Sequence, residues 1–187
     1  MSGVCPRVAP DPSSPAEEFA CLAALVVERL LVTDGVAASK FRTGAPVDDP
    51  AREARVLEQV RTEADAVGAD PDVAVAFFRN QIAASKVVQQ GLLARWSEHP
   101  DAAPATRPDL DQVRERLDRL TTGLLRELAA VSRLHEDPGV RAARLARAGR
   151  SHAARLDPLH RRALGAATRT GCGGPVTGGR RPPRSPE

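Results

Sequence analysis

The sequence predicts an all-α protein, a single-domain bundle of about six helices. Apolar residues make up 42% of the 187-residue chain and recur at intervals of three and four, as in amphipathic helices, and no convincing alternating strand pattern is present. Aromatic residues account for only 3%, so leucine, valine and alanine must form the core. Proline and glycine fall between the helical segments. One domain of this length can bury a sizeable core.

We expect the helical domain to span residues 14–170. Residues 1–13 are predicted to be a flexible N-terminus. Residues 171–187 are rich in glycine, proline and arginine, a composition typical of a disordered, basic tail.

The first helix carries an arginine on its apolar face. Ser14 is its predicted N-cap, Pro15 its first helical residue, and Thr33 its last, before the turn signal Asp34-Gly35. The apolar seam consists of Phe19, Leu22, Val26, Arg29 and Thr33. Arg29 either snorkels from the helix end or lies at the seam because it binds an anion.

The second helix is predicted to begin at Pro50, with Asp49 as its N-cap. Arg52 and Glu53 lie one turn before two apolar residues and extend the apolar stripe at the helix N-terminus, where backbone N–H groups add partial positive charge. The alternative interpretation is ordinary capping followed by a solvated first turn.

The chain contains two lysines, Lys40 and Lys86, against twenty-five arginines. Where arginine is the default cation, a lysine suggests a need for a compact point charge instead of a planar fork. Lys40 is therefore a candidate site residue, whereas Lys86 receives no role.

The third helix has two polar residues in its seam. Asp70 is expected to open this long helix, which ends near Trp96. Its seam consists of Phe78, Ile82, Ser85, Gln89, Leu92 and Trp96. A single polar residue in a seam often only fixes the register of packing. Because Ser85 and Gln89 lie one turn apart, we interpret them as the wall of a polar pocket.

A fourth helix is predicted to begin at Asp109, after a proline-rich linker over residues 97–108. Arg114 interrupts its seam, which otherwise consists of Leu110, Leu117, Thr121, Leu124, Leu128 and Val131. Arg29, Lys40 and Arg114 thus place three cations on apolar faces that carry too few acids to balance them. The simplest way to balance the charge is a bound anionic ligand.

The C-terminal part of the chain is basic. Residues 138–187 contain eleven arginines and two acidic residues. Four of the arginines fall every three residues, at positions 141, 144, 147 and 150, so they spread around a helix, and no aromatic residue accompanies them for base stacking. A solvated basic helix is favoured over a nucleic-acid site.

Several other classes of site are not indicated. The three cysteines and four histidines lack the spacing of metal ligands, so no metal site is expected. There is no glycine-rich phosphate loop, no nucleophile–base pair and no membrane span. The sequence as written begins with no secretory signal, which favours a cytoplasmic location by default.

The ordered set of candidate residues resembles the all-helical, type II-like chorismate mutases, closest to their exported subclass with its mycobacterial members. The set consists of Arg29, Lys40, Asp49, Arg52, Glu53, Ser85, Gln89 and Arg114. The resemblance covers roughly residues 17–172. It implies a helical bundle, usually a homodimer, with a complete active site in each chain. It also implies the rearrangement of chorismate to prephenate in aromatic amino acid biosynthesis, without cofactor or covalent intermediate.

The resemblance also implies roles for these residues. Arg29 and Arg114, assisted by Arg52, would bind the two carboxylates of chorismate. Lys40 and Gln89 would donate hydrogen bonds to the ether oxygen as its bond breaks. Asp49 and Glu53 would hold the ring hydroxyl or orient the cations. Ser85 would cap a carboxylate.

Two departures from the exported subclass affect the expectations. That subclass often has a glutamate at the position of Gln89, and it often has a disulfide to which Cys172 would contribute, with the partner position near Val140. Because Val140 is not a cysteine, we predict three free thiols, which counts against export. Two alternative functions are an inactive bundle that binds an aromatic dicarboxylate as a sensor, and a nucleic-acid binder that uses the basic C-terminal third.

Overall fold

The fold is all-helical, as predicted. The computed structural model describes residues 19–106, 108–134 and 136–168. These residues form six α-helices, a short 3₁₀ turn and no strand. The helices are α1 (Ala20–Thr43), α2 (Pro50–Ala66), α3 (Pro71–Glu98), α4 (Leu110–Ser132), α5 (Pro138–Ala153) and α6 (Pro158–Thr168).

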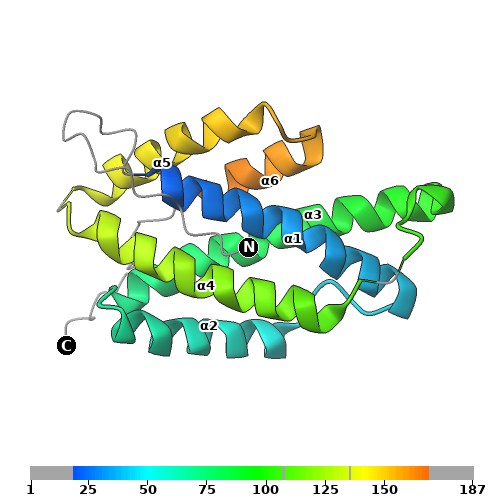
Figure 1. The fold of residues 1–187 in the computed structure, drawn as a ribbon, viewed down its shortest axis with the longest axis horizontal. Helices are drawn as coiled ribbons and strands as arrows, with labels where there is room; N and C mark the ends of the chain where they lie inside the picture. The colour runs from blue at the N-terminus through cyan, green and yellow to red at the C-terminus, as the bar shows by residue number, and fades with distance from the viewer. Residues whose placement is uncertain (1–18, 107, 135, 169–187) are drawn as a thin grey trace, which may run out of the picture.

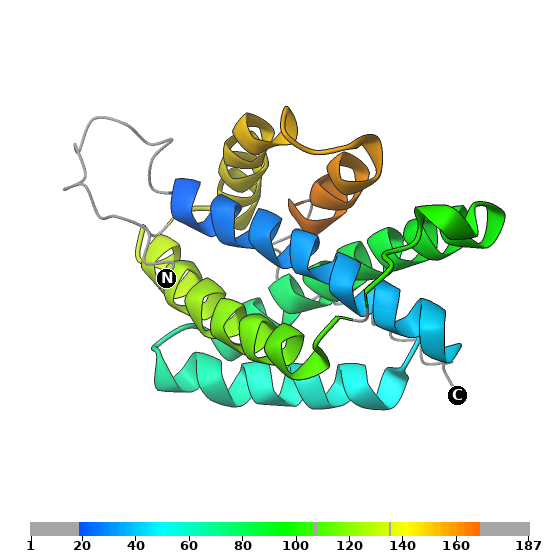
Figure 2. The ribbon, with the colours of Figure 1, turned by 45° about the vertical axis from the view of Figure 1, so that its right-hand side comes forward.

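Helix α1 is the central element of the bundle. It contacts α3, α4, α5 and α6, while α2 packs against α3 and α4 on the far side (Figure 1). Figure 2 shows α5 and α6 together on one side of α1, with α4 and α2 on the other. The helices bury a core of leucine, valine, alanine and phenylalanine side chains. Any residue on the buried faces of α1 therefore lies at the centre of the molecule.

Helices α1 and α3 run side by side in the same direction. The guanidinium carbon of Arg29 lies 5.7 Å from the centre of the Phe78 ring, and further along both helices the rings of Phe41 and Trp96 meet edge to face at 5.7 Å. This alignment sets the polar residues in the seam of α3 opposite those in the seam of α1.

The predicted N-cap Asp49 and the predicted helix starts at Asp70 and Asp109 are confirmed. Each of these aspartates accepts a hydrogen bond from a backbone N–H in the first turn of the following helix. The predicted start of the first helix at Ser14 lies outside the described residues. Its apolar seam is confirmed, since Phe19, Leu22, Val26 and Thr33 are buried and Arg29 is partly buried.

The predicted end of the first helix at Thr33 is wrong. Helix α1 continues through Asp34-Gly35 to Thr43 and ends at Gly44, which adopts the left-handed conformation with φ 68°. Tertiary contacts override the local turn signal. Asp34 accepts a hydrogen bond from His160, and a side chain at Gly35 would approach Val113 of α4 to 3.1 Å. Glycine thus allows α4 to pack closely against the middle of α1.

The basic helix α5 is only partly solvated. Arg147 and Arg150 are exposed, as expected for a solvated helix. Arg144 instead pairs with Glu136, and its guanidinium lies 5.5 Å from the centre of the Phe19 ring. The start of α1 is therefore packed against α5.

His160 joins α6 to α1 and has no counterpart in the sequence-based expectations. It is buried, and its Nε2 and Nδ1 atoms lie 2.9 Å from carboxylate oxygens of Asp34 and Asp157, respectively. The hydrogen bond to Asp34 is the main cause that raises the pKa of His160 to about 9, and Asp157 contributes in the same direction against the effect of burial. At neutral pH the ring is therefore a buried cation between two anions.

We expect this ion-paired histidine to make stability depend on pH. A pKa raised from 6.5 to about 9 on folding contributes stability that is fully present below pH 6.5 and is lost as pH rises to 9. In urea unfolding, His160→Gln should be less stable than the wild type at pH 6. That difference should narrow at pH 9, because His160 loses its proton as pH rises to its folded pKa. The narrowing should amount to about 1 to 2 kcal/mol, a value reduced by the screening that water gives the half-exposed carboxylates. A difference independent of pH would show that His160 is not charged in the fold.

Candidate active site

Arg29 is a partly buried cation, and two of its three guanidinium nitrogen atoms have no hydrogen-bond partner. Its Nε and Nη1 atoms are buried and donate no hydrogen bond to any described residue. Burial lowers its pKa to about 10, opposed by the nearby carboxylate of Asp118. The group therefore stays protonated at neutral pH, inside a site where an anion would be strongly favoured.

A chain of hydrogen bonds runs from α3 to α1 next to Arg29. Gln89 Nε2 donates to Ser85 Oγ at 3.1 Å, and Ser85 Oγ lies 3.1 Å from Thr33 Oγ1, which itself donates to the carbonyl oxygen of Arg29 at 3.2 Å. Because the single proton of Thr33 is used in this way, Ser85 is the donor to Thr33. This leaves the second amide hydrogen of Gln89 available, and its buried Oε1 has no partner among the described residues.

The structure brings Ser85 and Gln89 together with Thr33 in a polar region between α1 and α3. Thr33 was predicted to lie in the seam of the first helix but was not predicted as a site residue. Its position one turn after Arg29 is the sequence feature that could have indicated a role in the site.

Lys40 lies at the end of α1 and holds the connection to α2. Its Nζ donates to the carbonyl oxygens of Pro46 at 2.8 Å and Val47 at 3.1 Å. An ammonium group has three N–H donors, so one is not used by these contacts. Burial is the main cause that lowers the pKa of Lys40. The lysine is therefore a partly desolvated point charge with a donor to spare.

The first turn of α2 lies within the electrostatic reach of Lys40. The charges of Asp49 and Glu53 raise the pKa of Lys40, whereas that of Arg52 lowers it. The structure thus brings together Lys40 and the predicted cluster at the start of α2.

The capping interpretation also applies to this cluster. Asp49 Oδ1 accepts a hydrogen bond from the backbone N–H of Arg52 at 2.9 Å. Glu53 Oε1 accepts a hydrogen bond from the backbone N–H of Asp49 at 3.4 Å. Glu53 Oε1 also lies 2.8 Å from the ammonium of Lys86. The Arg52 side chain is exposed, so the expectation that it extends a buried stripe is wrong. It lies one turn before the point at which the helix reaches its packed neighbours.

The expectation that Arg114 lies in a buried seam is also wrong. Its side chain is 55% exposed and pairs with Asp111, one turn earlier, at 3.0 Å. The fully buried residues of α4 begin at Leu120, and the earlier apolar residues Leu110, Val113 and Leu117 are only partly buried. The structure does not bring Arg114 into contact with the other predicted site residues.

Other contacts fix the start of α4 relative to α1. Arg42 Nη2 donates to the carbonyl oxygens of Pro104 at 2.8 Å and Ala105 at 2.6 Å, and so holds the linker. Arg116 of α4 donates to Glu28 of α1 at 2.9 Å. These two arginines were not identified from the sequence, since neither lies in a seam.

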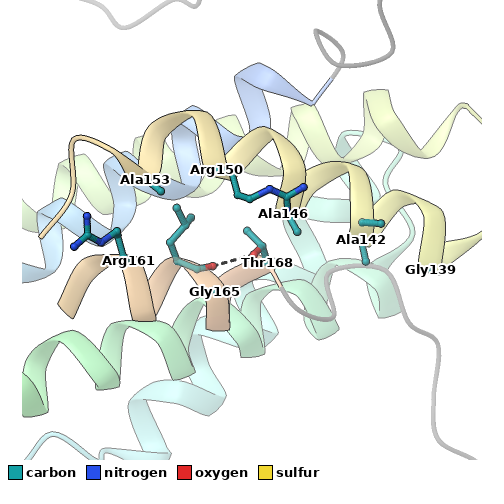
Figure 3. Close-up of a pocket in the computed structure, with 11 residues that line it drawn as sticks. Gly139, Ala142, Ala146, Arg150, Ala153, Arg161, Gly165 and Thr168 are labelled. Atoms are coloured by element: carbon teal, nitrogen blue, oxygen red, sulfur yellow. Dashed lines mark hydrogen bonds between the residues drawn. The ribbon is translucent and has the colours of Figure 1, made fainter. Parts of the chain in front are cut away.

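A separate hollow of about 530 Å³ lies between α5 and α6 (Figure 3). Alanine and glycine make up most of its lining, and it carries the exposed Arg150 and Arg161. The Thr168 hydroxyl is occupied, since it donates to the carbonyl oxygen of Leu164 at 3.0 Å. None of the predicted site residues lines this hollow, and its walls offer no buried polar group that would orient a ligand.

The described part of the chain contains no cluster of three histidine, cysteine or acidic side chains that could hold a metal ion. Within the same residues, no helix combines the length and apolar character that a membrane span needs.

The prediction of three free thiols is wrong, because Cys21 is disulfide-bonded. Cys5 and Cys172 lie outside the described residues. The prediction considered only a disulfide between Cys172 and a position near Val140, at the start of α5. The start of α1 packs against α5, so Cys21 lies in the same part of the fold although it is distant in sequence.

Comparisons with known proteins place this geometry in context. The family described as chorismate mutase type II matches residues 20–90. A secreted chorismate mutase from Mycolicibacterium smegmatis is 37% identical over 92% of this chain and 94% of its own length. A secreted chorismate mutase from Mycobacterium tuberculosis is 34% identical over 86% of this chain and 83% of its own length.

Solved structures extend the similarity to the whole bundle. A crystal structure of chorismate mutase from Burkholderia thailandensis has a TM-score of 0.74 and 38% sequence identity. The alignment covers 83% of this chain and 99% of that one. The likeness therefore reaches well beyond the segment of α1 to α3 that the family matches.

The unpaired cation leads to a prediction about stability. Replacing a buried charge with an apolar side chain of similar volume is often stabilising. We expect Arg29→Met to raise the free energy of unfolding of the ligand-free protein by about 1 to 3 kcal/mol in urea titrations. Arg116→Met, which removes an exposed and paired arginine, is the control and should not stabilise. A destabilised Arg29→Met would mean that Arg29 already has its counter-ion in the ligand-free fold.

Proposed function

The chain belongs to the chorismate mutase type II family, an isomerase family, and we propose that it rearranges chorismate to prephenate in the polar region between α1, α3 and the start of α2. The observation that carries this proposal is that the buried Nε and Nη1 atoms of the Arg29 guanidinium have no hydrogen-bond partner among the described residues. Chorismate is a dicarboxylate, so one of its carboxylates can accept hydrogen bonds from Nε and Nη1 and remove the cost of the buried charge.

The reaction is an intramolecular Claisen rearrangement. The ether C–O bond breaks while a C–C bond forms within the same molecule, and no proton is transferred. Catalysis therefore consists of holding the reactive conformation and stabilising the negative charge that grows on the ether oxygen. Donors fixed in advance, in a region with little water, supply the second effect.

Lys40 and Gln89 are our candidates for these donors. Each retains an N–H that the described contacts leave available, the third of the ammonium and the second of the amide. Hydrogen bonds to a developing charge are stronger in the transition state than in the ground state, so they raise kcat. An acceleration of ~10⁶ needs about 8 kcal/mol, and several contacts of ~2–4 kcal/mol each could supply it.

We propose that Arg114 and Arg52 bind the second carboxylate. Both are exposed in the ligand-free fold, so Arg114 would exchange Asp111 for the substrate. A surface ion pair of this kind contributes little, and its loss would oppose substrate binding only weakly. Ser85 would cap a carboxylate, and Asp49 and Glu53 would orient the cations around Lys40.

Export and assembly belong to the proposal as well. The relatives from Mycolicibacterium smegmatis and Mycobacterium tuberculosis are named secreted chorismate mutases, and a disulfide at Cys21 suits an oxidising compartment. We propose that this chain is exported, that its helical domain spans residues 14–170, and that it forms a homodimer.

The two carboxylate-binding arginines can be tested by kinetics. Arg29→Ala and Arg114→Ala should each lower kcat/KM by at least ~10²-fold, about 2.7 kcal/mol, because each loses a charge-assisted contact to substrate. The assay is the spectrophotometric loss of chorismate with purified protein, and circular dichroism checks the fold. Arg119 is an exposed arginine of α4, the helix that carries Arg114, and Arg119→Ala should retain wild-type turnover. A folded variant with wild-type kcat/KM would remove that arginine from the site.

A second kinetic prediction concerns Gln89. A neutral amide donates at any ordinary pH, so kcat/KM of the wild type should be flat between about pH 5 and 8. Gln89→Glu can donate only while protonated, so its activity should persist at low pH and fall as the acid ionises. Equal activity of both proteins at pH 8 would mean that Gln89 does not contact the ether oxygen. A variant inactive at every pH would point to disturbed packing between Ser85 and Thr33.

A further inference from the structure

Lys86 connects three separate parts of the fold beside the proposed site. Its ammonium lies 2.8 Å from Asp48 Oδ1, in the connection between α1 and α2, and 2.8 Å from Glu53 Oε1, in the first turn of α2. The lysine itself belongs to α3. Its side chain is 27% exposed and that of Glu53 is 28% exposed, so water screens the Lys86–Glu53 pair less than an ordinary surface pair.

The same connection is held from the other side by Lys40. The carbonyl oxygens that Lys40 binds belong to Pro46 and Val47, and Val47 directly precedes Asp48. Two lysines, one from α1 and one from α3, thus hold adjacent residues of one short segment. Any shift of Asp48 would move the carbonyl oxygens that locate the Lys40 ammonium.

Lys86 does not face the polar region in which Gln89 lies. Gln89 donates to Ser85 and Ser85 contacts Thr33 of α1, whereas Lys86 pairs with one acid of the connection between α1 and α2 and with one acid of α2. On that side it lines an open groove of about 320 Å³ between α2 and α3, together with Arg79 and Ile82. The contacts that link Lys86 to the proposed site are therefore those with Asp48 and Glu53.

The charges of Asp48 and Glu53 explain why their pairing with Lys86 matters for Lys40. Asp48 and Glu53 both act on Lys40, and each carboxylate could accept a hydrogen bond from its ammonium. Lys86 occupies an oxygen of both carboxylates. With the two acids paired elsewhere, Lys40 keeps its third N–H for the substrate.

We propose that Lys86 is a positioning residue of this enzyme, which holds Asp48 and Glu53 so that the Lys40 ammonium stays directed at the substrate ether oxygen. This inference rests on the proposed role of Lys40. It assigns to the second lysine of the chain a role that its position outside the seam of α3 did not indicate.

The test uses the full-length protein and the chorismate-loss assay. Lys86→Met should lower kcat about 10-fold and change KM less than threefold, because a misdirected ammonium weakens the transition state more than substrate binding. Lys86→Arg, which can still pair with both acids, should recover at least a third of the wild-type kcat. Arg79→Met is the matched control, because it removes a cation from the same groove, and its kcat should stay within twofold of the wild type.

A double-mutant cycle separates positioning from general stability. In the Lys40→Met background, Lys86→Met should lower the residual kcat less than threefold, because Lys86 acts through Lys40. Equal losses in both backgrounds, or a wild-type kcat for Lys86→Met, would overturn the inference. Wild-type activity of Lys40→Met alone would instead refute the proposed role of Lys40. Circular dichroism of every variant identifies any loss that is due to unfolding.

Discussion

A guanidinium with two buried nitrogen atoms that lack a hydrogen-bond partner is the constraint around which this bundle is arranged. Arg29 lies on the central helix α1, above the Phe78 ring, with two nitrogen atoms that no described residue satisfies. Such a group destabilises the ligand-free fold and is retained where a ligand needs it. The alignment of α1 with α3 then places the chain of Thr33, Ser85 and Gln89 next to this charge. The core of leucine, valine and alanine maintains that alignment without competing for the polar atoms.

The second part of the site depends on a short connection. Between Gly44 and Pro50 the chain reverses from α1 into α2, and the two lysines hold it from both sides. Lysine suits this task because a compact ammonium can bind two or three oxygen atoms that lie close together.

The other side of α1 serves mainly to hold that helix in place. His160 of α6 binds Asp34, Arg144 of α5 covers Phe19, and Cys21 is disulfide-bonded. The contacts of His160 and Arg144 attach α6 and α5 along the same helix that carries Arg29 and Lys40. The basic character of α5 is therefore in part structural, since Arg144 is used in packing while Arg147 faces solvent.

The sequence by itself determined the features that depend on neighbouring residues. The capping aspartates Asp49, Asp70 and Asp109, the seam of α1 and the paired Ser85 and Gln89 follow from spacing along one helix, because caps and periodicity are local.

Only the tertiary structure decided the features that depend on another helix. Asp34-Gly35 does not end α1, because His160 and Val113 approach from elsewhere in the chain. Arg114 is exposed and pairs with Asp111 although its spacing matches the seam of α4, because periodicity along one helix cannot report which of its positions another helix covers. Lys86 pairs with acids that lie on other elements of the fold. The packing of other elements around Arg29 likewise leaves its Nε and Nη1 atoms buried without a hydrogen-bond partner. Burial and ion pairing arise between distant segments, so the sequence pattern names the candidates and packing assigns their contacts.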